Sequence, residues 1–271
     1  MTRMMGPAEC GGLGMLLVVI AALACPGAAR AARQETGFLD RVLRLGGSRY
    51  RYQVYLPVNF DIDRKWPVVL FLHGAGERGA DGLRPTQTGL APAIRWDAIR
   101  FPALAVFPQA PNDSTWLGEP GEAALAALDA TIEEFSGDRD RVILTGISMG
   151  GYGAWDLAFR HPDLFAAIVP LCGGIVPPEG VHAVRLSPAV AGQADPYGFV
   201  AARLTRLPVW VFHGAKDTSI PVTESRRMVE ALKRAGAYVK YTEYPDAGHD
   251  CWTAAYGDPE LWTWALEQRR K

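Results

Sequence analysis

The sequence predicts one three-layer α/β domain with a mostly parallel, doubly wound sheet that starts with an antiparallel hairpin. The first observation is a series of short, nearly unbroken apolar runs, which are typical of strands buried on both faces. These runs cover residues 67–72, 103–107, 141–145, 165–171, 208–212 and 239–244. The second is that helical patterns fall between the runs, because strands that alternate with helices form parallel sheets. The clearest helical patterns cover 122–135, 221–235 and 259–268. The third is a pair of alternating runs within 41–57 that flank Gly46-Gly47-Ser48, a hairpin pattern.

Length and composition restrict the kind of protein. The 271 residues suffice for one large α/β domain with a sizeable core. Lys and Arg number 28 against 29 Asp and Glu, so no overall electrostatic field recruits nucleic acid or an acidic membrane. A hydrophobic content of 49% with 21% charged residues is globular rather than disordered. These figures disfavour a collagen, a coiled coil, a disordered tail and a nucleic-acid scaffold.

Residues 1–31 are expected to be an export signal. The apolar run 13–24 is shorter than the roughly 20 residues that span a membrane, but it has the length of a signal-peptide core and is followed by small residues. Cleavage fits after Ala24 or Ala31, and we favour Ala31; acylation of Cys25 in a lipoprotein is a minor alternative. Residues 32–271 then form a single secreted or periplasmic domain with no integral membrane segment.

Two cysteines remain after such cleavage, Cys172 and Cys251. They could pair in an oxidising compartment or stay free and buried, and the sequence leaves both possibilities open. No H-E-x-x-H or C-x-x-C motif occurs in the sequence, so no metal centre is predicted.

The strongest chemical signal is Gly146-Ile147-Ser148-Met149-Gly150, directly after the apolar run 141–145 and directly before a helical stretch. This is the context of a nucleophile elbow, where a serine projects its hydroxyl from a tight strand-to-helix turn. Glycine suits positions 146 and 150 because the turn is crowded and the helix must pack against its strand. The sequence therefore predicts Ser148 as a catalytic nucleophile.

A nucleophilic serine needs a base, and the base needs an acid that orients it. Asp217 and His249 each follow a predicted strand, at the end where ligands gather in open α/β sheets. Both come after Ser148 in the order acid then histidine, which one class of hydrolases uses. Asp195 and Asp250 are weaker candidates for the acid, since the first lies in a long connection and the second is adjacent to the histidine.

The other predicted roles involve the backbone. His73 and His213 each precede a glycine at the end of an apolar run, and we expect them to make structural hydrogen bonds. An oxyanion needs two backbone N–H donors. One is expected from Met149, the residue after the nucleophile, and the other from the loop 73–76, where Ala75 is favoured over Gly74.

Five motifs occur in order and together resemble one superfamily. They are LHGAGERGAD at 72–81, PQAP and a later Trp within 108–116, GISMGGYGAWDLA at 146–158, FHGAKDTSIP at 212–221 and AGHDCWTAAYGDPELWTW at 247–264. From residue 38 onward the chain resembles the α/β-hydrolase superfamily, specifically the exported bacterial prolyl-oligopeptidase-like esterases, also labelled phospholipase/carboxylesterase or feruloyl-esterase-like. The resemblance implies the α/β-hydrolase fold and acyl transfer to water without a cofactor. It implies Ser148 as nucleophile, His249 as base and then acid, Asp217 as its orienter, and the amides of Ala75 and Met149 as oxyanion hole.

An ester is expected as substrate rather than a peptide. Full prolyl oligopeptidases carry a β-propeller whose blades take about 40–50 residues each, and the domain leaves no room for one. We expect a serine carboxylic-ester hydrolase for small or aryl- and carbohydrate-linked esters; the alternative is a serine peptidase for short peptides.

A non-catalytic binding module is disfavoured by the intact triad. Dienelactone hydrolases use cysteine as nucleophile, so Ser148 counts against that activity.

Three aromatic and two charged residues are candidates for substrate contacts. Trp116, Trp252 and Tyr256 either floor an aromatic acyl or sugar site or pack in the core. Glu77 and Arg78 either recognise an acidic or sugar group or, as we favour, form a local ion pair that shapes the loop.

The connection 173–207 is expected to be a cap over the pocket, because long connections often have this role. Its four prolines argue against a large apolar lipase lid.

Overall fold

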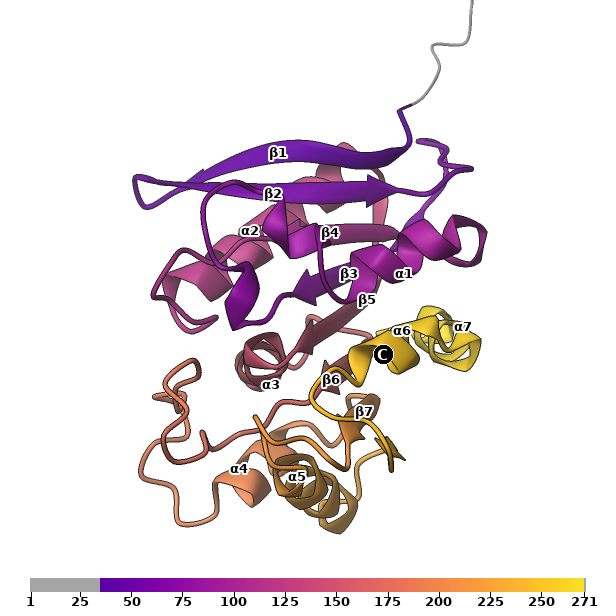
Figure 1. Ribbon diagram of the computed structural model, residues 1–271. Coiled ribbons are helices and arrows are strands. Elements are labelled where there is room, and N and C mark those ends of the chain that lie inside the picture. Colours follow the sequence, from indigo (N-terminus) through magenta and orange to yellow (C-terminus); the bar gives the residue numbers. More distant parts are fainter. Residues whose placement is uncertain (1–34, 271) are drawn as a thin grey trace, which may run out of the picture. The chain divides into compact units, whose positions relative to one another are not determined.

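Eight strands form one sheet in the order β1-β2-β4-β3-β5-β6-β7-β8 in the computed structural model, which describes residues 35–270 (Figure 1). The strands are β1 (Gly37–Leu45), β2 (Ser48–Leu56), β3 (Trp66–Leu72), β4 (Leu104–Pro108), β5 (Gly137–Ile147), β6 (Ala167–Leu171), β7 (Val209–Gly214) and β8 (Val239–Tyr244). β1 and β2 pair antiparallel, as do β2 and β4. All other neighbours pair parallel. The predicted sheet, mostly parallel with an antiparallel start, is confirmed.

The hairpin between β1 and β2 turns at Gly46 and Gly47, with Leu45 opposite Ser48. Both glycines have positive φ, 54° and 84°. A two-residue hairpin turn of this type requires left-handed backbone at both positions, which glycine adopts without steric cost. The predicted hairpin is therefore explained by its turn residues.

Helices cover both faces of the sheet (Figure 1). One face carries α1 (Leu90–Trp96), α6 (Trp252–Gly257) and α7 (Pro259–Glu267), and the other carries α2 (Glu119–Glu134), α3 (Met149–Arg160), α4 (Pro196–Arg203) and α5 (Thr223–Arg234). Separate buried clusters lie on the two faces. The predicted three layers are confirmed. The sequence did not predict α1, α4 and α6, because helices of six to eight residues are too short to show a clear period.

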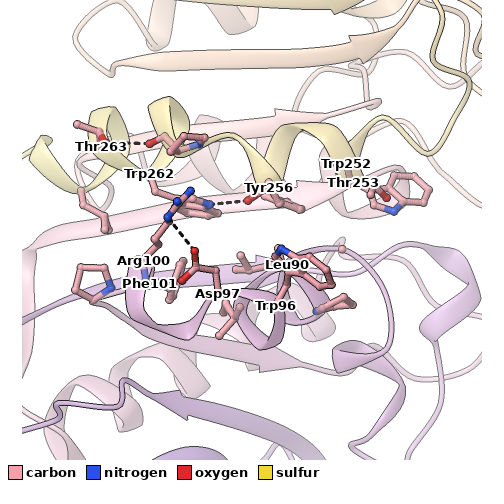
Figure 2. A pocket seen from close by; sticks show the side chains of 18 of the residues that line it. Leu90, Trp96, Asp97, Arg100, Phe101, Trp252, Thr253, Tyr256, Trp262 and Thr263 are labelled. Atoms are coloured by element: carbon pink, nitrogen blue, oxygen red, sulfur yellow. Dashed lines mark hydrogen bonds and ion pairs between the residues drawn. The ribbon is translucent and has the colours of Figure 1, made fainter.

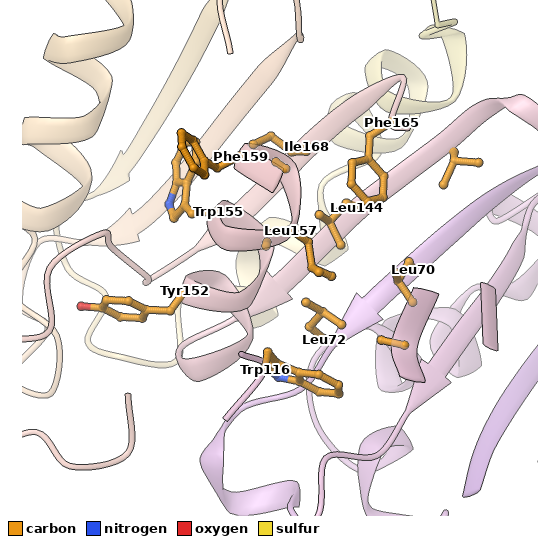
Figure 3. Packing of buried hydrophobic residues seen from close by; sticks show 14 of the residues in the cluster. Leu70, Leu72, Trp116, Leu144, Tyr152, Trp155, Leu157, Phe159, Phe165 and Ile168 are labelled. Atoms are coloured by element: carbon orange, nitrogen blue, oxygen red, sulfur yellow. The ribbon is translucent and has the colours of Figure 1, made fainter. Parts of the chain in front are cut away.

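The packing of α3 holds the centre of the molecule together. Figure 3 shows Leu157 of α3 over Leu72 of β3 and Leu144 of β5, all fully buried. Complete burial of a leucine side chain contributes about 1.5–3 kcal/mol relative to its exposure. Apolar contacts of α3 with β3 and β5 therefore anchor the junction at which β5 ends and α3 begins.

The strand prediction was wrong in one respect, the burial of β8. Each residue of β3, β4, β6 and β7 is buried, as the apolar runs predicted. β8 is half-buried along its whole length, because it is an edge strand with a neighbour only at β7. Its sequence VKYTEY mixes apolar and polar residues, as an edge strand allows.

The connection 173–207 contains α4, which is fixed to its neighbours. The rings of Phe199 and Phe159 lie 5.3 Å apart between centroids, and Arg203 donates to the Phe159 carbonyl at 2.6 Å. The Tyr197 hydroxyl donates to Glu224 Oε2 on α5 at 2.6 Å. A cap over the pocket stays a prediction.

The predicted export signal, its cleavage sites and Cys25 lie outside the described residues. Within residues 35–270, no helix combines the length and the apolar character needed to cross a membrane.

Candidate active site

Ser148 lies on the turn between β5 and α3 with φ 53° and ψ −117°. A positive φ is uncommon for a residue with a side chain and costs about 1–3 kcal/mol, so the surrounding structure must impose it. A Cβ on Gly150 would stand 1.9 Å from the Leu72 carbonyl oxygen, and one on Gly146 would stand 2.3 Å from the Gly150 carbonyl oxygen. The predicted reason for both glycines, crowding of the helix against its strand, is confirmed. The turn has the geometry of a nucleophile elbow.

The structure brings Ser148, Asp217 and His249 together. His249 Nε2 is 2.8 Å from Ser148 Oγ, and His249 Nδ1 is 2.7 Å from Asp217 Oδ2. The three residues follow β5, β7 and β8, so three strand ends converge on one point. Because the carboxylate accepts from Nδ1–H, the lone pair of Nε2 faces the serine hydroxyl. The arrangement suits proton transfer from Ser148 to His249.

Every oxygen of the Asp217 carboxylate has partners. Oδ1 accepts from the amides of Ser219 and Ile220 at 2.8 and 2.9 Å. Oδ2 lies 3.1 Å from Nε2 of His213 in addition to its bond with His249. Burial by itself raises the pKa of Asp217, but the hydrogen bonds from both histidines and the Ile220 amide outweigh it and hold the pKa well below its ordinary value. The carboxylate is therefore ionised and fixed in direction.

His213 was expected to make structural hydrogen bonds, and this is confirmed. Its ring is fully buried, with Nδ1 2.7 Å from Ser225 Oγ and Nε2 3.0 Å from the Ile220 carbonyl oxygen. The prediction missed that His213 also contacts Asp217. The signal was present in FHGAKD, where three residues lie between the two across a tight turn.

His73 makes the other predicted structural contacts. The Ala110 amide donates to its Nε2 at 3.0 Å, so Nδ1 carries the hydrogen and donates to the Gly74 carbonyl at 2.6 Å. Burial, with a smaller contribution from the Arg78 charge, lowers the pKa of His73 to about 4 against the opposing effect of the Gly74 bond. The neutral ring holds the loop after β3 from beneath.

The rival acids lie elsewhere. Asp195 is the N-cap of α4 and accepts from the Gly198 amide at 3.0 Å. Among the described residues, Asp250 makes no hydrogen bond to His249, whereas Asp217 does. The geometry agrees with the choice of Asp217.

The loop after β3 passes beside Ser148. Gly74 is extended, and a Cβ on it would stand 3.7 Å from the Ser148 Cβ. Ala75 begins a short 3-10 helix, Ala75–Glu77, and Met149 begins α3. The first amides of a helix have no acceptor within it, and neither amide donates to another loop carbonyl in the described part of the chain. Both N–H groups are thus available to a ligand oxygen.

The favoured ion pair between Glu77 and Arg78 does not form. Arg78 instead donates to the carbonyl oxygens of Ala75 and Ser114 at 2.9 and 3.2 Å. Across residues 35–270, the Glu77 carboxylate makes no ion pair within 4.0 Å. The hydrogen bonds of Arg78 to backbone oxygens therefore shape the loop, and the Glu77 carboxylate does not take part in them.

The predicted aromatic contacts separate into buried and accessible ones. Trp116 is 1% exposed; its indole donates to the His73 carbonyl at 3.0 Å and its ring packs on the His73 ring. The structure thus places Trp116 in the core beneath the loop, where packing against Gly153 and His73 leaves its ring no open face. Tyr256 is also buried and bonds Thr145 Oγ1 at 2.8 Å.

Trp252 is partly exposed and lies beside His249, with the ring centroids 5.5 Å apart and the rings edge to face. It also lines a groove of about 1060 Å³ between α1 and the pair α6–α7 (Figure 2). Other aromatic rings in that lining are Trp96, Phe101, Tyr256 and Trp262. Trp252 is therefore the one predicted aromatic contact that touches both the histidine and an open surface.

Cys172 and Cys251 are both buried, and both thiols are free. Burial raises the pKa of the Cys172 thiol well above its ordinary value, and contact with Cys251 adds to the shift. Donor atoms of Cys172, Asp217 and His249 lie within 4.8 Å of one another. A cation could use them only by giving up the hydrogen bond between Asp217 and His249, so the geometry favours the hydrogen-bonded triad.

Sheet order, strand-end convergence and elbow together define an α/β-hydrolase. The chain matches the family model Esterase, described as "Putative esterase", over residues 44–266, and it belongs to this family.

Two of three similar proteins carry esterase names. The chain is 30% identical over 212 residues to an "Uncharacterized secreted protein" of Arthroderma benhamiae, covering 72% of this chain and 22% of that protein. It is 28% identical over 141 residues to "Feruloyl esterase B" of Thermothelomyces thermophilus, covering 48% of this chain and 46% of that protein. Among solved structures, "Crystal Structure of a Thermostable Esterase" is 30% identical with a TM-score of 0.70, over 86% of this chain and 63% of that one. The chain spans less than half the length of the two curated relatives.

Proposed function

We propose that this protein is an exported serine carboxylic-ester hydrolase that works through an acyl-enzyme. The observation that carries the proposal is the continuous hydrogen-bonded series from Asp217 through His249 to Ser148. Membership of the Esterase family supports ester hydrolysis as the reaction.

The first half-reaction forms the acyl-enzyme. Ser148 Oγ attacks the carbonyl carbon of the ester while His249 Nε2 takes the hydroxyl proton. Asp217 stabilises the resulting imidazolium and keeps Nδ1–H directed at its carboxylate. The negative charge that develops on the carbonyl oxygen is stabilised by the amides of Ala75 and Met149, the second of which also lies at the positive end of α3. Collapse expels the alcohol, which takes the proton from His249.

The second half-reaction repeats these steps with water. His249 removes a proton from water, the hydroxide adds to the acyl carbon, and Ser148 leaves with the proton that His249 returns. The same serine, histidine, aspartate and backbone amides act in both half-reactions.

Small, aryl- or carbohydrate-linked esters are the proposed substrates. The indole of Trp252 lies beside His249 and favours a substrate with an aromatic or sugar ring, because such rings pack against the face of an indole. A relative named "Feruloyl esterase B" supports the same class. The connection 173–207 is proposed to border this site as a cap.

Export is proposed on two grounds. Residues 1–31 have the pattern of a signal peptide, and one relative is named a secreted protein.

The test compares the protein with its Ser148→Ala variant on 4-nitrophenyl acetate and on the matching 4-nitroacetanilide. We expect ester hydrolysis to fall by about 10³-fold or more in the variant, with little anilide cleavage in either protein. Ser48→Ala, on the exposed turn into β2, is the matched control and should keep full activity. A sulfonyl fluoride should transfer its sulfonyl group to Ser148 with loss of HF, and the peptide that contains Ser148 should gain the mass of the reagent less that of HF.

Other outcomes are informative in distinct ways. Anilide cleavage as fast as ester cleavage would favour the peptidase alternative. Turnover of neither substrate, with no sulfonylation of Ser148, would contradict the esterase proposal.

A further inference from the structure

Glu77 has an unusual position for an acidic residue. It ends the short 3-10 helix Ala75–Glu77 and is half-buried. A Cβ on Gly74 would stand 3.2 Å from Glu77 Oε2 and 3.7 Å from the Ser148 Cβ. The carboxylate and the nucleophile thus flank the same small space above Gly74.

The cationic side chains of this loop and the amide of Gln109, which contacts the loop, have other partners. Arg78 donates to the carbonyls of Ala75 and Ser114, and Arg84 pairs with Asp81. The Gln109 side chain donates to the backbone oxygen of Glu77, at 3.0 Å, and not to its carboxylate. Within residues 35–270, neither oxygen of the Glu77 carboxylate has a hydrogen-bond or ion-pair partner. The carboxylate is therefore free to bind a ligand.

A free carboxylate at this place has a cost for the proposed reaction. The carbonyl oxygen of the ester gains negative charge in the transition state, and a second negative charge nearby opposes that gain. A positive charge on the substrate reverses the effect, because it pairs with the carboxylate and offsets the repulsion. The net electrostatic effect of Glu77 is thus to discriminate between substrates by charge.

We propose that Glu77 is a specificity-determining residue that selects esters carrying an ammonium group close to the scissile bond and rejects anionic ones. This inference rests on the proposed ester hydrolysis at Ser148. The sequence left open that Glu77 and Arg78 together recognise an acidic group. The proposal replaces that possibility, because a bare carboxylate repels an acidic group and Arg78 is held by backbone oxygens.

The test uses substrates that differ in charge and not in shape. Acetylcholine and 3,3-dimethylbutyl acetate are isosteric and place a cation or a neutral carbon on the alcohol side. The 4-nitrophenyl esters of 6-aminohexanoic and heptanoic acid make the corresponding pair on the acyl side. For the full-length protein, we expect kcat/KM to be about five- to tenfold higher for the cationic member of at least one pair. In Glu77→Gln, which keeps the shape and removes the charge, this ratio should fall to about one.

Glu230→Gln is the matched control. Glu230 is exposed on α5 and pairs with Arg234 at 3.7 Å, so this change removes one negative charge without touching the loop, and the ratio should stay as in the unmodified protein. The preference should also shrink as ionic strength rises.

Equal rates within both pairs, or a preference that persists in Glu77→Gln, would overturn the inference. Failure of the proposed function has a different signature, namely that Ser148→Ala leaves hydrolysis of the neutral esters unchanged.

Discussion

Two loops meet at Ser148, and they differ in how completely their acidic side chains are partnered. The loop after β7 holds Asp217, whose two oxygens receive bonds from two backbone amides and two histidines. The loop after β3 holds Glu77, whose carboxylate has no partner in the described part of the chain. Both loops follow the carboxyl end of a buried strand, so position alone does not separate them. A saturated carboxylate can only orient its neighbours, whereas an unsaturated one can still bind a ligand.

The largest expected effect is a loss of activity on changing Asp217, in the loop after β7. Asp217→Asn keeps the shape of the side chain but can donate a hydrogen to His249 Nδ1, which favours the wrong tautomer. We expect kcat on 4-nitrophenyl acetate to fall by about 10³- to 10⁴-fold, as in other serine triads. Asp250→Asn is the control, since Asp250 is adjacent to His249 in the chain and does not bond it. Similar losses from the two changes would contradict the assignment of the acid.

The second largest expected effect is a loss of activity on changing the backbone of the loop after β3. Ala75→Pro removes the proposed oxyanion donor while the preceding residue, Gly74, already has the extended conformation that proline requires, with φ −75° and ψ −179°. We expect kcat to fall by about 10²- to 10³-fold with a near-native circular dichroism spectrum. Ala75→Ser retains the amide and should stay within about threefold of the unmodified protein. An unaffected proline variant would move the donor to another residue of the loop.

The smallest expected effect is on stability, which should depend on pH differently through His73 in the loop after β3 and through Asp217 in the loop after β7. His73 anchors the loop after β3, and burial holds its pKa at about 4 in the folded protein against about 6.5 in an unfolded chain. The unfolded chain therefore binds the extra proton first, and stability should fall as pH decreases from about 6.5 to about 4, by roughly 3 kcal/mol. Asp217 has a lowered pKa, so its contribution is present above about pH 3.9 and is lost only as pH falls further, through the folded value.

Urea unfolding at several pH values measures this loss, and NMR of the imidazole ring measures His73 directly. We expect the His73 resonance to stay that of a neutral ring down to about pH 4. A midpoint near 6.5 would show that the ring is not held between the Ala110 amide and the Gly74 carbonyl.

The sequence predicted more of the site than of its surroundings. Ser148 could be found because the elbow is a local pattern in which strand, glycine and helix are adjacent in the chain. Asp217 and His249 followed from chain order and from their places after apolar runs. Substrate contacts could not be found in this way, because Trp116 and Trp252 look alike in sequence. One is buried under His73 and the other lies beside His249 on an open groove.

The loop after β3 shows the same limit. Adjacent opposite charges at Glu77 and Arg78 favour an ion pair when only the chain is considered. In the folded protein, carbonyl oxygens of Ala75 and Ser114 compete for the guanidinium and bind it. Ser114 is far along the chain from Arg78, so no local pattern announces the contact. The edge position of β8 was missed for a similar reason, since neighbours in a sheet are set by topology.

By itself, the sequence determined the alternation of strands and helices, the hairpin at Gly46 and Gly47, and the strained turn that carries Ser148. These depend on backbone preferences and apolar periodicity, which act between residues close in the chain. Only the tertiary structure decided that both oxygens of Asp217 are saturated, that Trp116 is covered and that the Glu77 carboxylate has no partner among residues 35–270. Hydrogen-bond saturation and burial depend on which distant groups arrive at the same place, and that is a property of the packed fold.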